Sequence, residues 1–403
     1  MAGLACAVKL HEAGVPVRIF EASDGVGGRV RTDIVDGYLL DRGFQVYLDA
    51  YPETGKLLDL ESLDLRTFEP GAMIFNGKRL YRLMDVFRRP GSLFAGALAP
   101  IGSLFDKLRV ARLRYKILKR SDHDIWQSKA MTTEAYLKNE GFSAKMIDRF
   151  FRSFYGGIFL ERELQTTSRM FEFTFKLFSK GSATLPAKGM GEIPKQLAAR
   201  LPAGSVSLNT SVVKAHAKSV ELADGTRIDG SATVVATELG QAAKLGADFK
   251  PANSKWRSVS NVYFAAEDSP LNEAIIALNG SGEGLVNNVC VLSDASSAYA
   301  PEGKSLVSVS VLGLNNSPDL DSKIKKELRA WFGAQVDNWK HLRTDRIRHA
   351  LPEHPASSER SPLEDSIHRK GIWICGDHSA SASIEGAVIS GQKVAQKILE
   401  AHA

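Results

Sequence analysis

Cysteine is scarce in this chain of 403 residues: Cys6, Cys290 and Cys375 are widely separated and form no Cys-x-x-Cys pair. This spacing argues against a disulfide framework and a cysteine zinc site, and it favours a reducing compartment. No apolar run reaches the length of about 18 residues that a membrane-spanning helix needs. The chain also lacks the charged start and short apolar segment of a secreted protein. We therefore expect a cytoplasmic protein.

Metal and nucleic-acid motifs are lacking as well. None of the nine histidines stands in His-Glu-x-x-His or another metal spacing, so we predict no metal site. No nucleic-acid-binding module is recognisable, and we expect no nucleic-acid partner. The hydrophobic content of 44% and charged content of 24% are typical of a globular protein, which argues against a mostly disordered or fibrous chain.

Positive charge is concentrated in one segment. The chain has 52 Lys and Arg against 46 Asp and Glu, a net charge of +6. Residues 78–120 contain twelve Lys and Arg against Asp85 and Asp106, a local charge of +10, which leaves −4 for the rest. Within this segment, residues 92–105 are apolar but too short to span a bilayer. Residues 104–120 then repeat apolar side chains at helical spacing, opposed by basic ones.

This pattern has two interpretations. A basic amphipathic helix beside an apolar segment is typical of contact with a membrane surface, which residues 78–120 would provide. The alternative is an ordinary helix that packs on the rest of the protein and leaves a solvated basic face.

The first residues indicate a nucleotide-binding unit. Residues 3–11 are good helix formers and stop at Gly14, and residues 15–21 are a β-branched run that ends in Glu21. Gly-Val-Gly-Gly-Arg-Val-Arg-Thr follows at 25–32. This order is typical of the second half of a dinucleotide-binding βαβ unit. The first strand and two glycines of Gly-x-Gly-x-x-Gly are missing, which a truncated chain or misplaced start explains; otherwise the segment is merely a helix and a strand.

Three ordered motifs carry a family resemblance. The first motif is Gly-Gly-Arg-Val-Arg-Thr at 27–32, followed by Asp-Arg-Gly at 41–43. The second, in the middle of the chain, is Leu-Pro-Ala-Lys-Gly-Met-Gly-Glu at 185–192. The third, near the end, is Gly-Asp at 376–377, followed by Ser-Ile-Glu-Gly-Ala at 383–387. Together they resemble the superfamily of flavin-containing amine oxidases and carotenoid desaturases. Uncharacterised phytoene-desaturase-like oxidoreductases are the most similar branch.

The resemblance implies an α/β fold in which two domains are interleaved. A Rossmann-like, glutathione-reductase-like FAD-binding domain would comprise residues 1–65, 185–245 and 346–403. An α+β substrate-binding domain would comprise residues 66–184 and 246–345. FAD would be held non-covalently, since no cysteine matches the attachment site. The implied FAD contacts are Gly3, Glu21, Ala22, Ser23, Gly27, Gly28, Arg29, Gly43, Val212, Gly376, Asp377, Ile384, Glu385 and Ala387.

The substrate is predicted to be apolar. Amine oxidases of the superfamily commonly carry a cage aromatic where this chain has Ser383, which argues against an amine. Residues 150–178 hold nine aromatic side chains, suited to an isoprenoid or carotenoid pocket, although packing of a core explains them too. The alternation of Phe171, Phe173 and Phe175 has the period of a strand. His349, His354 and His378 lie near the expected flavin segments, where a core or surface role competes with substrate contact.

The leading prediction is therefore an FAD-dependent oxidoreductase that desaturates an apolar substrate by hydride abstraction. No residue is identified as catalytic. Oxygen or a quinone is the expected electron acceptor, because no second nucleotide site is recognisable. The alternatives are an amine oxidase, a redox-neutral polyene isomerase, and a non-catalytic relic that binds no flavin.

Overall fold

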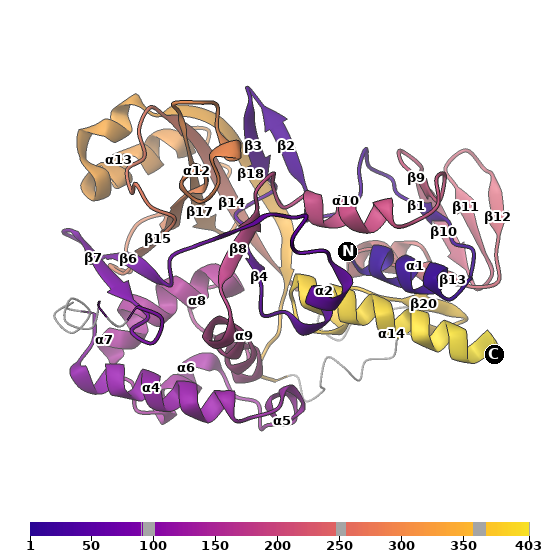
Figure 1. The fold of residues 1–403 in the computed structure, drawn as a ribbon, viewed down its shortest axis with the longest axis horizontal. Coiled ribbons are helices and arrows are strands. Elements are labelled where there is room, and N and C mark those ends of the chain that lie inside the picture. Colours follow the sequence, from indigo (N-terminus) through magenta and orange to yellow (C-terminus); the bar gives the residue numbers. More distant parts are fainter. Residues whose placement is uncertain (90, 92–100, 247–254, 358–367, 403) are drawn as a thin grey trace.

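The computed structural model describes residues 1–89, 91, 101–246, 255–357 and 368–402, and it divides into two regions (Figure 1). One region contains both chain ends and the helices α1 and α14. The other contains a large sheet with helices on either side of it. This mixture of helices and strands is the predicted α/β fold class. Part of the basic segment predicted to contact membranes, residues 90 and 92–100, lies outside the described residues.

The first region is assembled from three distant parts of the chain. α1 (Ala2–Glu12) packs along α14 (Ile384–His402) and also contacts α10 (Glu192–Ala199). Gly391 permits the close crossing of α1 and α14, because a Cβ there would lie 2.1 Å from the Ala2 carbonyl oxygen. Three small sheets and one more helix complete this region. In the first sheet, β1 (Ile19–Phe20) pairs in parallel with β9 (Val206–Ser207), and in the second, β13 (Thr233–Val235) pairs in parallel with β20 (Ile372–Ile374), which is antiparallel to β19 (His368–Arg369). The third is the antiparallel sheet of β10 (Val212–His216), β11 (Ser219–Leu222) and β12 (Arg227–Asp229), and the helix is α11 (Leu239–Lys244).

A seven-stranded sheet dominates the second region. Its strand order is β18-β14-β17-β16-β15-β6-β7, and all neighbours are antiparallel except β15 and β6. The strands are β6 (Gly71–Phe75), β7 (Leu80–Met84), β14 (Trp256–Ala266), β15 (Ile276–Asn279), β16 (Val286–Val291), β17 (Ser305–Leu312) and β18 (Lys340–Pro352). Both predicted insertions contribute strands to it. β18 runs through residue 346, the predicted start of the last FAD segment, and the domain division stays a prediction.

Both faces of the large sheet are buried. On β14, Val262 and Phe264 pack with Trp331 of α13 (Leu320–Phe332), whereas Tyr263 between them belongs to the core on the opposite face. This alternation follows from the two-residue period of a strand. Three short helical turns also belong to this region: α12 (Leu292–Ala295), η3 (Ser297–Tyr299) and η4 (Gly333–Asn338).

A group of helices lies on the side of the sheet away from α13 (Figure 1). They are α4 (Leu104–Leu118), α5 (Asp122–Trp126), α6 (Thr133–Asn139), α7 (Ala144–Met146), the π-type turn η2 (Ile147–Phe151), α8 (Arg152–Phe159) and α9 (Ser168–Lys180). Hydroxyl caps begin most of them. Ser103, for example, accepts a hydrogen bond from the backbone of Asp106, whose carboxylate accepts one from the backbone of Ser103.

The strand period predicted around Phe171 is wrong, because this segment is the helix α9. The rings of Phe171 and Phe175, one helical turn apart, lie 5.7 Å from each other, and Phe173 packs 5.6 Å from Trp126 on another side. Apolar side chains cover a wide arc of α9, and the polar residues Glu172 and Lys176 on its other side are buried too. Because the apolar arc is wide, alternate residues of this helix imitate the pattern of a strand.

A hairpin and a small sheet connect the two regions. The hairpin is β2 (Thr32–Val35) and β3 (Tyr38–Asp41), and the small sheet has the order β4 (Tyr47–Leu48), β8 (Ala183–Pro186), β5 (Leu65–Thr67), with α2 (Pro52–Leu57) beside it. Among the described residues, no helix is both long and apolar enough to cross a membrane.

Candidate functional site

The N-terminal end of α1 lies at a junction of charged residues. Gly3 packs against the end of β13, where a Cβ on this glycine would lie only 3.0 Å from the Cβ of Ala236. The amino group of Met1 is buried, which lowers its pKa, and it lies within electrostatic reach of Arg29, Asp377 and Glu21. Four of the predicted FAD contacts, from both ends of the chain, therefore surround one helix end.

The acidic end of β1 adjoins the start of β10. Glu21 accepts hydrogen bonds from the backbone N–H and the hydroxyl of Ser23, at 2.9 and 2.8 Å. The backbone N–H of Thr210 donates to the Glu21 carbonyl oxygen and that of Asn209 to the Ser23 carbonyl oxygen. These bonds bring Val212, two residues further, close to Glu21, Ala22 and Ser23, as the predicted site requires.

The glycine turn after β1 places Arg29. Gly27 and Gly28 have φ of +107° and +64°, and a Cβ on Gly27 would lie 2.3 Å from the Val30 carbonyl oxygen, whereas space is open at Gly28. The guanidinium of Arg29 donates to Asp377 at 2.7 Å and to the Ala350 carbonyl oxygen at 2.7 Å. Arg29 thus joins the first motif to Asp377, which with Gly376 lies just after the end of β20.

The residues of the C-terminal motif at 383–387 have different surroundings in the structure. Glu385 is fully buried and accepts from the backbone N–H groups of Glu53 and Thr54, both at 2.8 Å, and from the Thr54 hydroxyl. Its carboxylate therefore caps the N-terminus of α2. Ala387 packs in the α1–α14 core, and Ile384, half-buried, opens α14. The side chains of Glu385 and Ala387 are thus engaged by the protein itself.

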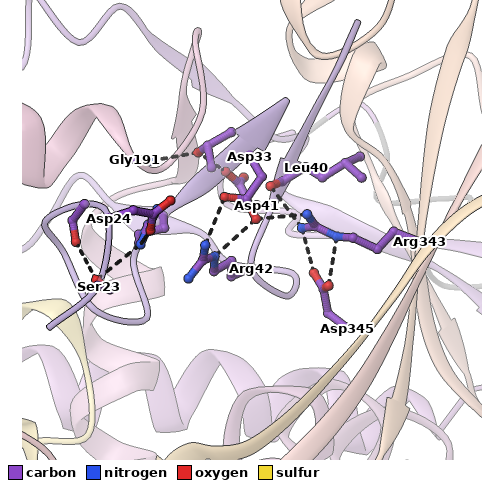
Figure 2. Close-up of polar contacts among 12 residues, drawn as sticks. Ser23, Asp24, Asp33, Leu40, Asp41, Arg42, Gly191, Arg343 and Asp345 are labelled. Carbon is purple, nitrogen blue, oxygen red and sulfur yellow. Dashed lines mark hydrogen bonds and ion pairs between the residues drawn. The ribbon is translucent and has the colours of Figure 1, made fainter. Parts of the chain in front are cut away.

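Figure 2 shows a polar network that fixes the β2–β3 hairpin. Arg343 of β18 lies between Asp33, at 2.9 Å, and Asp345, while Arg42 contacts Asp33 from the other side. The last residue of the hairpin, Asp41, is fully buried. Gly43 follows with φ of +88°, and a Cβ there would lie 2.7 Å from the Ile347 side chain. The predicted Gly43 therefore abuts β18.

Asp41 is the centre of this network, although in the sequence it stands out only as part of a motif. It accepts hydrogen bonds from the hydroxyls of Thr32 and Tyr299 and from the backbone of Met190. Burial raises the pKa of Asp41 to about 6, although these hydrogen bonds oppose the rise. The three partners come from three separate parts of the chain.

A pocket lies near Arg29 and the charged residues at the N-terminal end of α1. It is enclosed by α8, α9 and the ends of β14 and β18. Its lining is Phe159, Thr166, Met170, Arg257, Leu351, Pro352, Glu353, His354 and Ala382. Arg257 and Glu353 form an ion pair at 3.3 Å. The Nε2 atom of His354 is buried without a hydrogen-bond partner among the described residues. Burial lowers the pKa of His354 to about 4, so its imidazole is neutral at pH 7.

Only part of this pocket was predicted from the sequence. His354 is named from the sequence as a candidate for substrate contact, but Thr166, Arg257 and Glu353 were missed. No motif marks these three residues, which come together through strand pairing. His378, the other candidate beside Asp377, is enclosed and its pKa is lowered to about 4 by burial. His349 contacts Glu238 at 2.7 Å.

Comparison with known proteins identifies the family. Residues 1–399 match the family described as flavin containing amine oxidoreductase. The chain belongs to this family. The superfamily assignment made from the sequence is therefore confirmed, and the predicted class, a flavin-dependent oxidoreductase, is the class of this amine oxidoreductase family.

Individual relatives differ in what their names describe. A stretch of 59 residues is 42% identical to protoporphyrinogen oxidase 2, chloroplastic/mitochondrial, of Arabidopsis thaliana, but it spans only 15% of this chain and 12% of that protein. A putrescine oxidase solved with putrescine has a TM-score of 0.75 at 18% identity and covers 99% of this chain and 97% of its own. A reduced UDP-galactopyranose mutase has a TM-score of 0.71 at 14% identity, covering 99% and 94%. At these identities the structures share the fold alone.

Proposed function

We propose that this protein holds FAD non-covalently and oxidises an apolar substrate by abstraction of a hydride and loss of a proton from the adjacent carbon, forming a C=C bond. The observation that supports the proposal is the pocket, in which five of the nine lining residues are apolar: Phe159, Met170, Leu351, Pro352 and Ala382. The other four are Thr166, Arg257, Glu353 and His354. Ala382 and Leu351 belong to the segments next to predicted cofactor contacts, so an apolar molecule in this pocket lies beside that site. A bound flavin supplies the hydride acceptor.

The residues present fit a dinucleotide. The N-terminus of α1 lies at the junction where Arg29 lies, and the first backbone N–H groups of a helix, which have no acceptor within it, favour phosphate. Gly28 leaves open space on the same turn. Glu21, at the end of β1, would accept hydrogen bonds from ribose hydroxyls. Here Arg29 would position the pyrophosphate, and Asp377 would hold Arg29 in place.

An amine substrate is the second candidate, since the family takes its description from amine oxidoreductases. The pocket lining contains one aromatic residue, Phe159, rather than a facing pair. At the position expected for a cage aromatic, Ser383 bonds to the backbone of Gly386. The described residues thus favour an uncharged, apolar substrate, such as an isoprenoid polyene, over an amine.

Cofactor content is the first experiment. The purified chain is examined by visible absorption, and any released flavin is identified by mass spectrometry. We expect FAD to be released on denaturation. This result would exclude the alternative of a non-catalytic protein that binds no flavin. A colourless protein that takes up no added FAD would contradict the proposal.

Reaction type is tested next by anaerobic mixing with a polyene, protoporphyrinogen and putrescine. Bleaching of the flavin by the polyene, with a product lighter by two hydrogens, is the expected outcome. A product of unchanged mass would indicate isomerisation, and bleaching by putrescine alone would indicate an amine oxidase. We further propose oxygen or a quinone as the electron acceptor. The rates at which each restores the visible absorbance of the reduced flavin distinguish the two.

A further inference from the structure

Helix α4 has an exposed apolar face. Its opposite side packs into the protein through Leu113 and Ile117, which are buried against α9 and its neighbours. Nine large hydrophobic residues are exposed in the part of the chain that the structure describes, and five of them are on this one helix. They are Leu104, Phe105, Leu108, Tyr115 and Leu118, exposed by 65, 70, 61, 63 and 36%. This concentration is far from the scattered single residues of an ordinary surface.

Basic side chains border this apolar face. Arg112, Lys116 and Lys119 are exposed on the same helix. At 100° per residue, Arg112 and Lys119 lie on one flank of the row formed by Leu104, Leu108 and Tyr115. Lys119 lies 4.1 Å from the ring centre of Tyr115, and Lys116 pairs with Glu140. One face of helix α4 is therefore buried in the protein, and its exposed face combines apolar and cationic side chains.

The composition of this face distinguishes among occupants. Protein interfaces are depleted in lysine, whereas a surface that mixes leucine and phenylalanine with lysine and arginine suits an anionic lipid bilayer. Residues 78–120 carry a net sequence charge of +10, and six of their twelve basic side chains pair with carboxylates: Arg82, Arg89, Arg109, Arg114, Lys116 and Arg120. The exposed Arg112 and Lys119 therefore provide the positive charge beside the apolar row that attracts a negative surface. Figure 1 places α4 along the outer edge of the molecule, where a flat surface can approach it.

We propose that α4 docks the protein on an anionic membrane surface, with Leu104, Phe105 and Leu108 entering the headgroup region. Arg112 and Lys119 then pair with lipid phosphates. The helix has 15 residues, about 22 Å, and lies in the plane of the interface instead of crossing it. This inference stands apart from the proposed reaction, because it rests on no residue of the pocket.

Vesicle flotation of the full-length chain tests the proposal. We expect enrichment of about tenfold or more on phosphatidylcholine vesicles with about 30% phosphatidylserine over phosphatidylcholine alone, and strong loss in about 0.5 M NaCl. The double variant Phe105→Ser/Leu108→Ser and the charge variant Arg112→Glu/Lys119→Glu are each expected to remain unbound. Both pairs are exposed, so the variants should keep the melting temperature of the parent chain.

Matched controls are available on other elements. Ile34→Ser removes a hydrophobic residue that is 75% exposed on β2, and Lys340→Glu reverses a charge whose side chain is 74% exposed on β18. Both controls are expected to float like the parent chain. Equal enrichment on neutral and anionic vesicles, or binding that survives Phe105→Ser/Leu108→Ser, would overturn the proposal. A lipid-free dimer that these same substitutions dissociate would instead assign the face to a second copy.

Discussion

At the scale of single residues, Asp41 is the group through which we expect the stability of the protein to depend on pH. It is fully buried and its pKa is raised from 3.8 to about 6 by burial. The folded chain therefore keeps a proton over a pH range in which the unfolded chain has lost it. The free energy of unfolding should fall as the pH rises from about 4 to about 6, by at most ~3 kcal/mol from this group. Asp41→Asn should remove that slope, as urea titrations at several pH values would show.

Asp33 provides a control of opposite sign. Burial acts to raise its pKa, but the hydrogen bonds from Arg42 and Arg343 outweigh burial and hold the pKa below its ordinary value. Its contribution to stability is present above the unfolded pKa and is lost as the pH falls. Asp33→Asn should therefore weaken the protein mainly at neutral pH. If both variants changed the pH slope in the same direction, the assignment of Asp41 would be wrong.

Glu385 offers a second prediction at this scale. Its buried carboxylate caps α2 through two backbone N–H groups and the Thr54 hydroxyl. Glu385→Ala should lower the free energy of unfolding by about 2–4 kcal/mol, because it leaves buried donors without an acceptor. Thermal melting of the apoprotein measures this directly.

The exposed neighbour Glu53 is the matched control. Its side chain is 38% exposed and pairs with Lys56, so Glu53→Ala should change stability by less than about 0.5 kcal/mol. An unchanged melting temperature in Glu385→Ala, together with loss of flavin, would show that Glu385 serves the cofactor and not the helix cap.

At the scale of elements, the crossing of α1 and α14 depends on one glycine. A Cβ on Gly391 would lie 2.1 Å from the Ala2 carbonyl oxygen and 3.0 Å from the Cys6 nitrogen, both backbone atoms that cannot move alone. Gly391→Ala should therefore separate the helices and cost about 2–4 kcal/mol of stability. Gly55→Ala in α2 is the counterpart, since nothing lies within 4 Å of that position. It should stabilise by up to about 1 kcal/mol through helix propensity.

Elements also show what could be predicted from the sequence. The helix at 3–11 and the strand end at Glu21 were predictable, because helix formers, Gly14 and β-branched residues are local signals. The segment around Phe171 was not, because its environment is set by neighbouring helices. The engagement of Glu385 by α2 was likewise beyond reach, since it depends on a contact between residues more than 300 positions apart.

At the scale of the whole molecule, Arg29 and Asp377 connect segments 348 residues apart. Asp377 is only 8% exposed at its side chain, so loss of Arg29 leaves a nearly buried charge unpaired. A double-mutant cycle with Arg29→Met and Asp377→Asn should give a coupling energy of about 1–3 kcal/mol. Flavin retention should fall in both single variants.

The exposed pair of Arg66 and Asp64 is the reference for that cycle. Both side chains are about half exposed or more, at 49 and 58%, and their coupling should be below about 1 kcal/mol. Equal coupling in the two cycles would mean that Arg29 does not organise the junction.

The long connection of Arg29 to Asp377 could be anticipated, because both belong to motifs whose order along the chain predicts a shared ligand. The pocket could not. Phe159, Arg257, His354 and Ala382 come from four separate segments, and only the pairing of β14 with β18 and the packing of α8 and α9 bring them together. Composition predicted an apolar character for this region, and His354 was the one lining residue predicted individually.

The wide π-type turn η2 allows the chain before α8 to change in length by one residue without changing the pocket. It holds one residue more than ordinary helical pitch requires, directly before α8, whose last residue Phe159 lines the pocket. Deleting one residue within 147–151 would convert the wide turn to regular helical pitch and leave α8 facing as it does now, so Phe159 would keep its place in the lining. Deleting one residue within 152–158, where the helix is already regular, would turn Phe159 by about 100° about the helix axis and out of the lining, although no pocket residue had been substituted. Related chains that differ by a single residue should therefore keep their substrate preference when the difference falls in this turn and change it when it falls in α8.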